Sequence, residues 1–340
     1  MDEMATGSPD VLVEAQGLKK YFPVQQGFVA NLLTREKEYV RAVDGVDLRI
    51  RRGEVFGLAG ESGSGKTTTG RMLVRLIEPT AGTVRFEGTD LTSLKADEMR
   101  RLRQRMQVVF QDPYASLNPR MRIGDSIGHA LAIHKLADRL RRYEQVIDMM
   151  EKVGLSPATS IYRKYPHQVS GGQRQRIVLA RALVMRPDLV IADEPIAMAD
   201  VSVRSLLLKL MRDLKDEFGL TYVFITHDLA TARHICDRIA IMYLGRIAEV
   251  GLLTELYRHP AHPYTQALLA AVPVPDPRFR RTVAMPRGEI PNPINPPSGC
   301  RFHPRCPAAM PICSQAEPAL QSIGEDHQVA CHLIGGAREP

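Results

Sequence analysis

The sequence predicts an α/β fold with a parallel core sheet, accompanied by an antiparallel β subdomain, a helical subdomain and a small C-terminal module rich in proline and cysteine. Three observations lead to this prediction: strand-like apolar runs alternate with helical patterns, a glycine-rich loop joins one strand to one helix, and another apolar run ends in two carboxylates. Alternating strands and helices build a parallel sheet with helices on both faces. The 340 residues, of which 44% are hydrophobic, suffice for one large domain and a smaller one.

The glycine-rich loop is the clearest functional signal in the chain. It consists of Gly60, Glu61, Ser62, Gly63, Ser64, Gly65, Lys66 and Thr67, after an expected strand at 54–59 and before an expected helix at 68–77 that begins with Thr68. Glycines let successive backbone N–H groups point at a phosphate, and the N-terminus of the helix favours an anion. Lys66 is expected to reach the terminal phosphates and Thr67 to ligate Mg²⁺. The loop therefore predicts binding of a nucleoside triphosphate.

The remaining elements follow in order along the chain. Alternation of apolar and polar residues predicts antiparallel strands at 11–14 and 39–50, with a loop insertion between them at 24–37. Further short strands are expected at 83–86 and 106–110. A long stretch with helical spacing at 123–153 predicts the helical subdomain. Strand and helix signals resume at 177–184, 189–192, 206–214 and 222–225, and 239–250 reads as a hairpin around Gly245. Prolines dominate after Val272, and four of the five cysteines follow.

Charge and hydropathy limit the classes of partner. The net charge is +7, but the most basic stretch, 100–105, lacks interleaved aromatic residues and is interpreted as the exposed face of a short helix, so no nucleic acid is expected as a partner. No apolar run approaches the roughly 18 residues that a membrane span needs. The polar segment 1–10 does not resemble a signal peptide. We therefore expect a protein that stays in the cytosol.

Two further motifs carry chemistry. Asp193 and Glu194 end an apolar strand, where Asp193 is suited to hold Mg²⁺ and Glu194 to polarise the water that attacks the γ-phosphate. Ser170, Gly171, Gly172 and Gln173 open a helix and expose free N–H groups, which makes a second anion site.

Together, these motifs resemble those of the ATP-binding-cassette (ABC) ATPases in order and spacing, over about residues 11–256. The resemblance implies that Gln111 senses Mg²⁺ and the permease, and that Ser170 to Gln173 contact ATP bound on a partner subunit. It makes His227 the switch histidine beside the γ-phosphate, and Phe22, with Tyr21 as the second choice, the ring that stacks on adenine. Thr67, Gln111 and Asp193 would share the Mg²⁺.

One loop departs from the family pattern. After Glu194 the family commonly reads Pro-Thr-Ser-Ala-Leu-Asp, whereas this chain has Pro-Ile-Ala-Met-Ala-Asp, which ends at Asp200. Asp200 is retained, but a serine hydroxyl and a leucine are missing from a loop that meets the partner subunit in this family. The departure bears on communication between subunits and not on ATP binding.

Three segments narrow the resemblance to the dipeptide and oligopeptide importers. These are 111–120, the His-Pro-Tyr stretch at 258–265, and the sequence Cys-Arg-Phe-His-Pro-Arg-Cys-Pro at 300–307. The chain is similar to the second ATPase subunit of such importers. The expected domains are a nucleotide-binding domain at 11–258, with its helical subdomain at about 112–170, and a C-terminal extension at 259–340.

The four C-terminal cysteines are Cys300, Cys306, Cys313 and Cys331. In a reducing cytosol, clustered cysteines bind metal more often than they form disulfides. Their spacing lacks the Cys-x2-Cys sequence of common zinc sites, and the Cys-Pro pair at Cys306 also occurs in bacterial iron–sulfur sequences. The family resemblance favours a [4Fe–4S] cluster, with zinc as the alternative.

The resemblance implies an ATP-hydrolysing subunit that energises import of short peptides from the cytoplasmic face of the inner membrane. Its partners would be a non-identical sister ATPase, two transmembrane permease subunits and an extracytoplasmic peptide-binding protein. Alternatives are the same role for nickel chelates or antibiotics, a soluble cassette ATPase that acts on ribosomes or DNA, and a redox-sensing regulatory subunit. The single cassette and the C-terminal extension argue against the soluble enzyme, and intact Lys66, Glu194 and His227 argue against a purely regulatory role.

Overall fold

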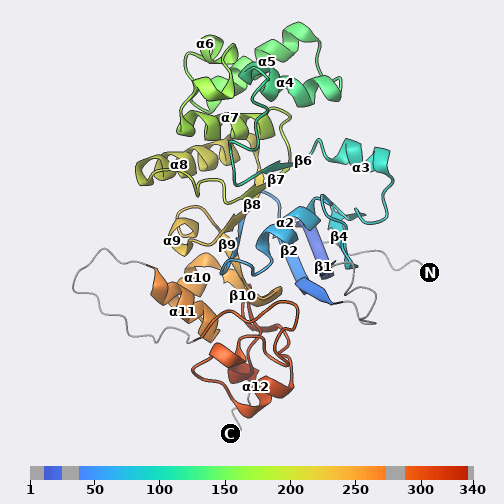
Figure 1. The fold of residues 1–340 in the computed structure, drawn as a ribbon, viewed down its shortest axis with the longest axis vertical. Coiled ribbons are helices and arrows are strands. Elements are labelled where there is room, and N and C mark those ends of the chain that lie inside the picture. Colours follow the sequence, from blue (N-terminus) through green and yellow to red (C-terminus); the bar gives the residue numbers. More distant parts are fainter. Residues whose placement is uncertain (1–10, 25–37, 273–287, 336–340) are drawn as a thin grey trace, which may run out of the picture. The chain divides into compact units, whose positions relative to one another are not determined.

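The computed structural model, drawn in Figure 1, describes residues 11–24, 38–272 and 288–335. They form two compact units. The first unit takes the chain up to Arg51, Phe56–Ser93 and the chain from Thr226 onward. The second unit takes Arg52–Val55 and Leu94–Ile225. Each unit is built around strands of its own, and each carries part of the predicted site.

The first unit contains the predicted antiparallel subdomain. It has the strand order β2-β1-β4-β5, with β1 at Val11–Pro23, β2 at Tyr39–Arg51, β4 at Ala81–Phe86 and β5 at Thr89–Asp90. Strand β1 runs nine residues beyond the expected 11–14, because its polar second half pairs with β2 up to Pro23 and Tyr39. The predicted insertion at 24–37 falls outside the described residues except for Val24.

A second group of strands in the first unit has the order β11-β12-β10-β9-β3. Strand β3 (Val55–Ala59) is parallel to β9 (Arg238–Tyr243), which forms an antiparallel hairpin with β10 (Arg246–Leu252). Leu244 and Gly245 both have positive φ, of 42° and 78°, as the turn of a tight hairpin requires. The predicted hairpin around Gly245 is therefore confirmed.

The helix after the phosphate loop ends earlier than the sequence suggests. Helix α2 spans Lys66–Leu73 instead of reaching residue 77. Arg75 takes a positive φ of 49°, and the N–H of Leu76 donates to the carbonyl of Arg71 at 2.8 Å. This turn closes the helix with the pattern of a Schellman cap, formed by an arginine where glycine is usual. The other helices of this unit are α9 (Leu229–Ala232), α10 (Leu253–Arg258), α11 (Pro263–Ala271), α12 (Pro311–Gln315) and α13 (His332–Gly335).

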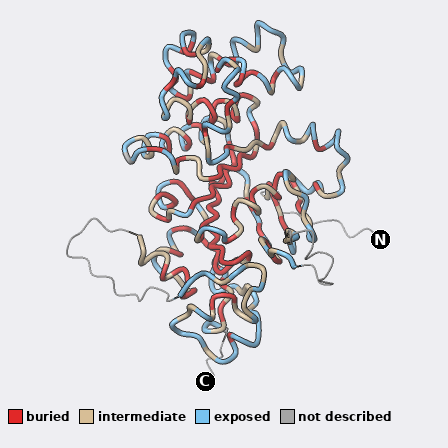
Figure 2. The backbone as a smooth tube through the Cα atoms, viewed as in Figure 1, coloured by how far each residue is buried: buried red, intermediate tan, exposed pale blue. Residues whose placement is uncertain are grey.

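The second unit holds three parallel strands in the order β8-β7-β6, at Thr221–Thr226, Leu189–Asp193 and Met106–Val109. Every residue of β7 and β8 is buried, as expected for strands covered on both faces, and Figure 2 shows the buried backbone along them. The helices are α3 (Ala96–Leu102), α4 (Ile123–Ile133), α5 (Arg139–Lys152), α6 (Ala158–Tyr162), α7 (Gly171–Leu183) and α8 (Val201–Phe218).

The helical subdomain predicted from the spacing at 123–153 is confirmed, but as two helices and not one. Lys135 has a φ of 52°, which interrupts the helix after α4. The Asp138 carboxylate then accepts a hydrogen bond from the Arg141 N–H at 2.9 Å and caps the start of α5. The apolar spacing continues across the break, so the interruption is visible only in the turn and the cap.

The C-terminal segment is partly irregular, as its prolines predict. Residues 288–302 form neither helix nor strand, and the prolines between Val272 and Gly288 lie outside the described residues. The segment also packs as ordinary protein does: strand β12 (His327–Val329) pairs with β10 and with β11 (Gln321–Gly324), while Phe302 and Val329 are fully buried. Packing against β10 therefore contributes to the order of this segment, in addition to whatever the cysteines hold. None of the described helices has the length and apolarity of a membrane span.

Candidate functional site

The phosphate loop has the close backbone contacts that explain its glycines. A Cβ at Gly65 would lie 2.2 Å from the carbonyl oxygen of Ala42, and φ there is 103°. A Cβ at Gly60 would lie 2.2 Å from the carbonyl oxygen of Met242. The loop is thus pressed against β2 and the end of β9, and only glycine fits these two positions.

Lys66 is buried within this loop. Its ammonium donates to the carbonyl oxygens of Gly60 and Glu61, each at 2.8 Å. Only 6% of the surface of Lys66 is exposed. The hydroxyl of Ser64 lies 3.4 Å from the same nitrogen. The charge that is expected to meet the terminal phosphates is therefore held at the loop by main-chain oxygens.

Glu61 is anchored by residues that the sequence did not single out for this role. Its N–H donates to the hydroxyl of Tyr264 at 2.9 Å, and its two carboxylate oxygens accept from the guanidinium of Arg305 at 2.8 and 3.1 Å. Tyr264 is the second residue of α11, within the His-Pro-Tyr stretch, and Arg305 precedes Cys306. The only sequence signal that pointed to them was the resemblance of these two stretches to importer ATPases.

The start of α11 is fixed by a buried histidine and a buried glutamate. Pro263 occupies the first helical turn, and His262 Nδ1 accepts from the Tyr264 N–H at 3.0 Å. Burial lowers the pKa of His262 to about 4, so the ring is neutral and carries its proton on Nε2. The Glu249 carboxylate, fully buried on β10, accepts from the N–H groups of Ala261 and His262 at 2.8 and 2.9 Å. His327 of β12 lies 2.8 Å from the same carboxylate.

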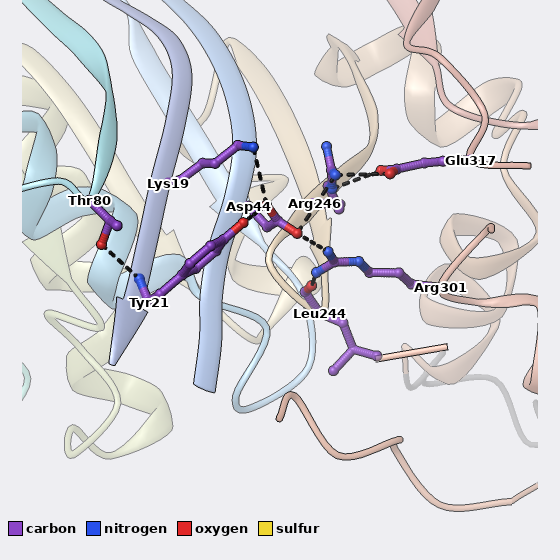
Figure 3. Close-up of polar contacts among 8 residues, drawn as sticks. All are labelled: Lys19, Tyr21, Asp44, Thr80, Leu244, Arg246, Arg301 and Glu317. Atoms are coloured by element: carbon purple, nitrogen blue, oxygen red, sulfur yellow. Dashed lines mark hydrogen bonds and ion pairs between the residues drawn. The ribbon is translucent and has the colours of Figure 1, made fainter. Parts of the chain in front are cut away.

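A second buried carboxylate, Asp44 on β2, joins the antiparallel subdomain to the C-terminal segment (Figure 3). It accepts hydrogen bonds from the Tyr21 hydroxyl and from the Arg301 guanidinium, and Arg246 lies 3.7 Å away. Burial by itself would raise the pKa of Asp44, but the Tyr21 hydrogen bond and the two guanidinium groups outweigh burial and lower it. Arg301 also donates to the carbonyl of Leu244.

This arrangement bears on the two candidate adenine-stacking residues. The hydroxyl of Tyr21 is committed to Asp44, and the Arg41 guanidinium lies 5.9 Å from the centre of its ring. Phe22 is the next residue of β1, so it faces the opposite side of the strand, and the Lys20 ammonium lies 5.2 Å from the centre of its ring. Both rings are partly exposed, and the choice of Phe22 over Tyr21 stays a prediction.

In the second unit, the structure brings two predicted catalytic residues together. The side-chain amide of Gln111 donates to the Glu194 carboxylate at 2.8 Å. Asp193 ends β7 with 3% of its surface exposed. Glu194 follows with a φ of 49°, an unfavourable backbone for a glutamate, and its N–H donates to the carbonyl of Ile225 at 3.0 Å. Strained backbone of this kind occurs where surrounding structure fixes a functional side chain.

The Ser170 motif forms a complete capping box at the start of α7. The Ser170 hydroxyl accepts from the Gln173 N–H at 3.3 Å, and the Gln173 side chain accepts from the Ser170 N–H at 3.0 Å. Apart from its two chain neighbours and the backbone of its own helix, no described atom lies within 4 Å of a Cβ placed at Gly171. Packing inside this chain therefore does not explain the glycine.

Two further predicted residues lie at strand-to-helix connections. His227 follows β8 directly and is exposed, and the next residue, Asp228, caps α9. Asp200 is exposed and stands at the start of α8. In the loop before it, Met198 is 57% exposed.

The four C-terminal cysteines lie in the same segment but do not form a metal geometry. Cys313 and Cys331 are buried, and the N–H of Cys300 donates to the carbonyl of Cys313 at 2.8 Å. Burial, and to a smaller extent the thiols of the other three cysteines, raise the pKa of Cys300 to about 11. Four soft sulfur donors suit iron–sulfur clusters or zinc. Among the described residues, however, no three His, Cys, Asp or Glu side chains are arranged to hold a metal ion, so the structure lends the expected cluster no support.

Comparison with known proteins places the chain in a family. Residues 43–197 match the family model described as ABC transporter, and residues 248–313 match that of the oligopeptide/dipeptide transporter C-terminal region. An oligopeptide transport ATP-binding protein of Bacillus subtilis, AppF, is 45% identical over 97% of this chain and 99% of its own length. The chain belongs to the oligopeptide/dipeptide branch of the ABC-transporter ATPases.

Other relatives agree with this assignment. A putative peptide import ATP-binding protein of Brucella ovis is 47% identical over 94% of this chain and 97% of its own. The dimeric structure of an ATP-binding cassette in a post-hydrolysis state, bound to ADP and Pi, has a TM-score of 0.62 and 27% identity, covering 71% of this chain and 99% of that one. The predicted fold class and family are confirmed. This ABC ATPase hydrolyses ATP in a reaction coupled to transport, with ATP and Mg²⁺ as its cofactors.

Proposed function

We propose that this ABC ATPase energises the import of short peptides, working peripherally at the cytoplasmic face of the inner membrane. Two permease subunits and an extracytoplasmic peptide-binding protein would complete the transporter. The proposal is supported by the names of its relatives, which are an oligopeptide transport and a putative peptide import ATP-binding protein, and by the matched C-terminal region. Nickel chelates or antibiotics are alternative substrates for the same machinery.

Uptake measurements test the substrate. Vesicles that contain the assembled transporter and its binding protein should accumulate a labelled tripeptide only with ATP supplied on the cytoplasmic side. A nickel chelate offered to the same vesicles serves as the comparison. Accumulation of the chelate without accumulation of peptide would contradict the peptide assignment and leave the ATPase assignment intact.

The observation that carries the catalytic assignment is the hydrogen bond between Gln111 and Glu194 beside Asp193. We propose that Glu194 is the general base, that Asp193, Gln111 and Thr67 share the Mg²⁺, and that Lys66 with Gly60 to Thr68 holds the phosphates. His227 would be the switch histidine beside the γ-phosphate, and Asp200 would belong to the residues that bind the nucleotide. A base needs its carboxylate oriented toward the attacking water, and the hydrogen bond from the Gln111 amide helps to fix the orientation of the Glu194 carboxylate.

Single substitutions separate these roles. Glu194→Gln should bind ATP and lose most of its turnover, whereas Lys66→Ala should lose affinity for ATP, because the ammonium then no longer meets the phosphates. Glu325→Gln, an exposed position in the turn between β11 and β12, is the matched control and should leave both unchanged. Near-normal turnover of Glu194→Gln in the assembled transporter would remove Glu194 from the mechanism.

We also propose that the ATPase works with a non-identical sister subunit. The chain has one phosphate loop and one Ser-Gly-Gly-Gln motif, and in this family ATP is held between the two motifs of different subunits. The space around Gly171 and the exposed Met198 in the altered loop support an interface with a second chain. Affinity purification of tagged chain from its native membranes should recover a second, different ATPase; active transporter that contains two copies of this chain alone would exclude the pair.

Finally, we propose that Cys300, Cys306, Cys313 and Cys331 bind a [4Fe–4S] cluster, with zinc as the alternative. The support is chemical: four thiols lie in one short segment joined by the Cys300–Cys313 backbone hydrogen bond. Protein purified without oxygen should contain iron and sulfide and be brown. Cys306→Ser should lose the metal, while Cys236→Ser, a buried cysteine outside the segment, should retain it. Metal content that is unchanged in Cys306→Ser would refute the site.

A further inference from the structure

The second residue of the phosphate loop, Glu61, has both its backbone N–H and its carboxylate hydrogen-bonded to the C-terminal extension. The Glu61 N–H donates to the Tyr264 hydroxyl, 203 residues away in sequence, and the Glu61 carboxylate accepts from the Arg305 guanidinium, 244 residues away. Lys66 in turn donates to the carbonyl of Glu61. The extension thus fixes the first peptide of the loop from both sides, and through it the main-chain oxygen that holds the phosphate-binding lysine.

Both anchors are rigid. Tyr264 is fully buried and packs against Tyr243 and Phe302, with ring centres 4.7 and 5.3 Å apart. The Arg305 side chain is 9% exposed, and its guanidinium also lies 3.3 Å from the Tyr243 hydroxyl. A bidentate arginine–carboxylate pair on a buried support has little freedom to move. The anchors therefore determine where Glu61 lies, and do not merely follow it.

Arg305 affects the binding of an anionic ligand because it balances the negative charge of Glu61. A carboxylate within the loop that receives a triphosphate repels it, and the effect is strong where few water molecules screen it. Arg305 balances this charge with two hydrogen bonds. Removing Arg305 would release the loop and leave a negative charge next to the phosphates.

We infer that Tyr264 and Arg305 are positioning residues for the phosphate loop, so that the C-terminal extension sets the affinity of this ATPase for nucleotide. The inference rests on the proposed role of the loop in binding the phosphates. The tyrosine of the His-Pro-Tyr stretch and the second arginine of the 300–307 sequence would thus both serve to position the phosphate loop. Neither residue is placed at the reacting atoms, so the effect should appear in binding and not in the chemical step.

Nucleotide binding by the full-length chain tests this inference. Titration with a fluorescent ATP analogue should show that Arg305→Ala weakens binding by about tenfold, and Tyr264→Phe by about threefold, the range expected for loss of a charged and of a neutral hydrogen bond. In the assembled transporter, the KM for ATP should rise by the same factors with kcat nearly unchanged. Arg305→Lys keeps the charge without the bidentate geometry and should lie between wild type and Arg305→Ala.

A double variant gives the sharpest readout. Because Glu61 repels phosphate once Arg305 is gone, Glu61→Ala combined with Arg305→Ala should bind ATP more tightly than Arg305→Ala alone, and within about threefold of wild type. A purely structural contribution of Arg305 would not be rescued by removing its partner. Additive losses in the double variant, or an unchanged KM in both Arg305→Ala and Tyr264→Phe, would overturn the inference.

Matched controls exclude a general loss of stability. Arg51→Ala breaks an ion pair with Asp326 that also joins β2 to the extension, at 2.6 Å, but does not touch the loop. Tyr222→Phe removes a buried hydroxyl that has no hydrogen-bond partner in the described structure. Both should leave the KM for ATP unchanged. If Lys66→Ala also failed to weaken binding, the proposed role of the loop would be wrong; if Lys66→Ala alone weakened it, only this inference would be wrong.

Discussion

Replacing Asp44 by asparagine tests how strongly the C-terminal extension is tied to the ATPase. Asparagine keeps the shape but removes the charge that balances Arg301, a side chain only 8% exposed. Two hydrogen bonds to the carboxylate, from Arg301 and from Tyr21, lose their ionic character. Hydrogen bonds to charged groups contribute about 1.5–3 kcal/mol each, and breaking a buried ion pair costs about 3–5 kcal/mol. We expect Asp44→Asn to lower the free energy of unfolding by about 3–5 kcal/mol.

The pH dependence of this loss has a definite sign. The pKa of Asp44 is lower in the folded protein than its ordinary value of 3.8, so the folded state binds the proton more weakly than the unfolded state. The stabilisation by the ionised carboxylate is therefore complete above the unfolded-state pKa and is lost as the pH falls through the folded-state pKa. The difference between wild type and Asp44→Asn should be constant from about pH 5 to 8 and shrink below about pH 4.

Urea unfolding followed by circular dichroism measures the effect, since the chain has no tryptophan to report by fluorescence. Asp326→Asn is the control: its pair with Arg51 has side chains 27% and 39% exposed, and such pairs contribute at most about 1 kcal/mol. A loss in Asp44→Asn no larger than that in Asp326→Asn would refute the reasoning. A difference that persisted unchanged at low pH would show that the charge of Asp44 is not its cause.

Three further outcomes are expected. Burial lowers the pKa of His262 to about 4, so between about pH 6.5 and 4 the unfolded state binds a proton that the folded state does not. The free energy of unfolding of the wild type should therefore fall over this range. In His262→Asn this part of the pH dependence, measured by urea unfolding, should disappear. Gly65→Ala should abolish ATP binding in the fluorescent titration, because its Cβ would lie 2.2 Å from a carbonyl oxygen. Gly63 also has a positive φ, but a Cβ there would meet no described atom within 4 Å beyond its chain neighbours. Gly63→Ala should therefore still bind ATP and lower the free energy of unfolding by about 1–2 kcal/mol. Ending the chain at Arg258 should yield protein that neither folds stably nor binds ATP; a truncated chain with wild-type affinity would contradict the extension's structural role.

The sequence predicted well the features that depend on neighbouring residues. The strand before the phosphate loop, the hairpin at Gly245 and the helix that opens at Ser170 are each specified within a few residues, and each is found. The same reasoning missed the end of α2, because a positive φ at an arginine has no sequence signature. It also joined α4 and α5 into one pattern, because apolar spacing continues across the break.

Contacts between distant residues explain the rest. The sequence placed Glu61 in the phosphate loop and Arg305 beside a cysteine, but nothing in either segment says that they pair across 244 residues. Periodicity reports which face of an element is buried, and not which element covers it. The sequence likewise did not predict the hydrogen bond between Gln111 and Glu194, although it assigned both residues to the same reaction. Pairing of charged groups was therefore the main information that the structure added.

These pairs change how the C-terminal extension is to be understood. Three carboxylates of the cassette each accept at least one hydrogen bond from the extension, namely those of Asp44, Glu61 and Glu249. Asp44 and Glu249 have at most 4% of their surface exposed. A buried carboxylate without partners is costly, so the cassette would be destabilised without these donors. The cassette and the extension are separate stretches of sequence, with the boundary predicted near residue 258, yet the extension belongs to the same compact unit as the phosphate loop. The extension is ordered by packing on β10 or by a metal that the cysteines hold. Because the phosphate loop lies in the same unit, either of these also affects the site where nucleotide is bound.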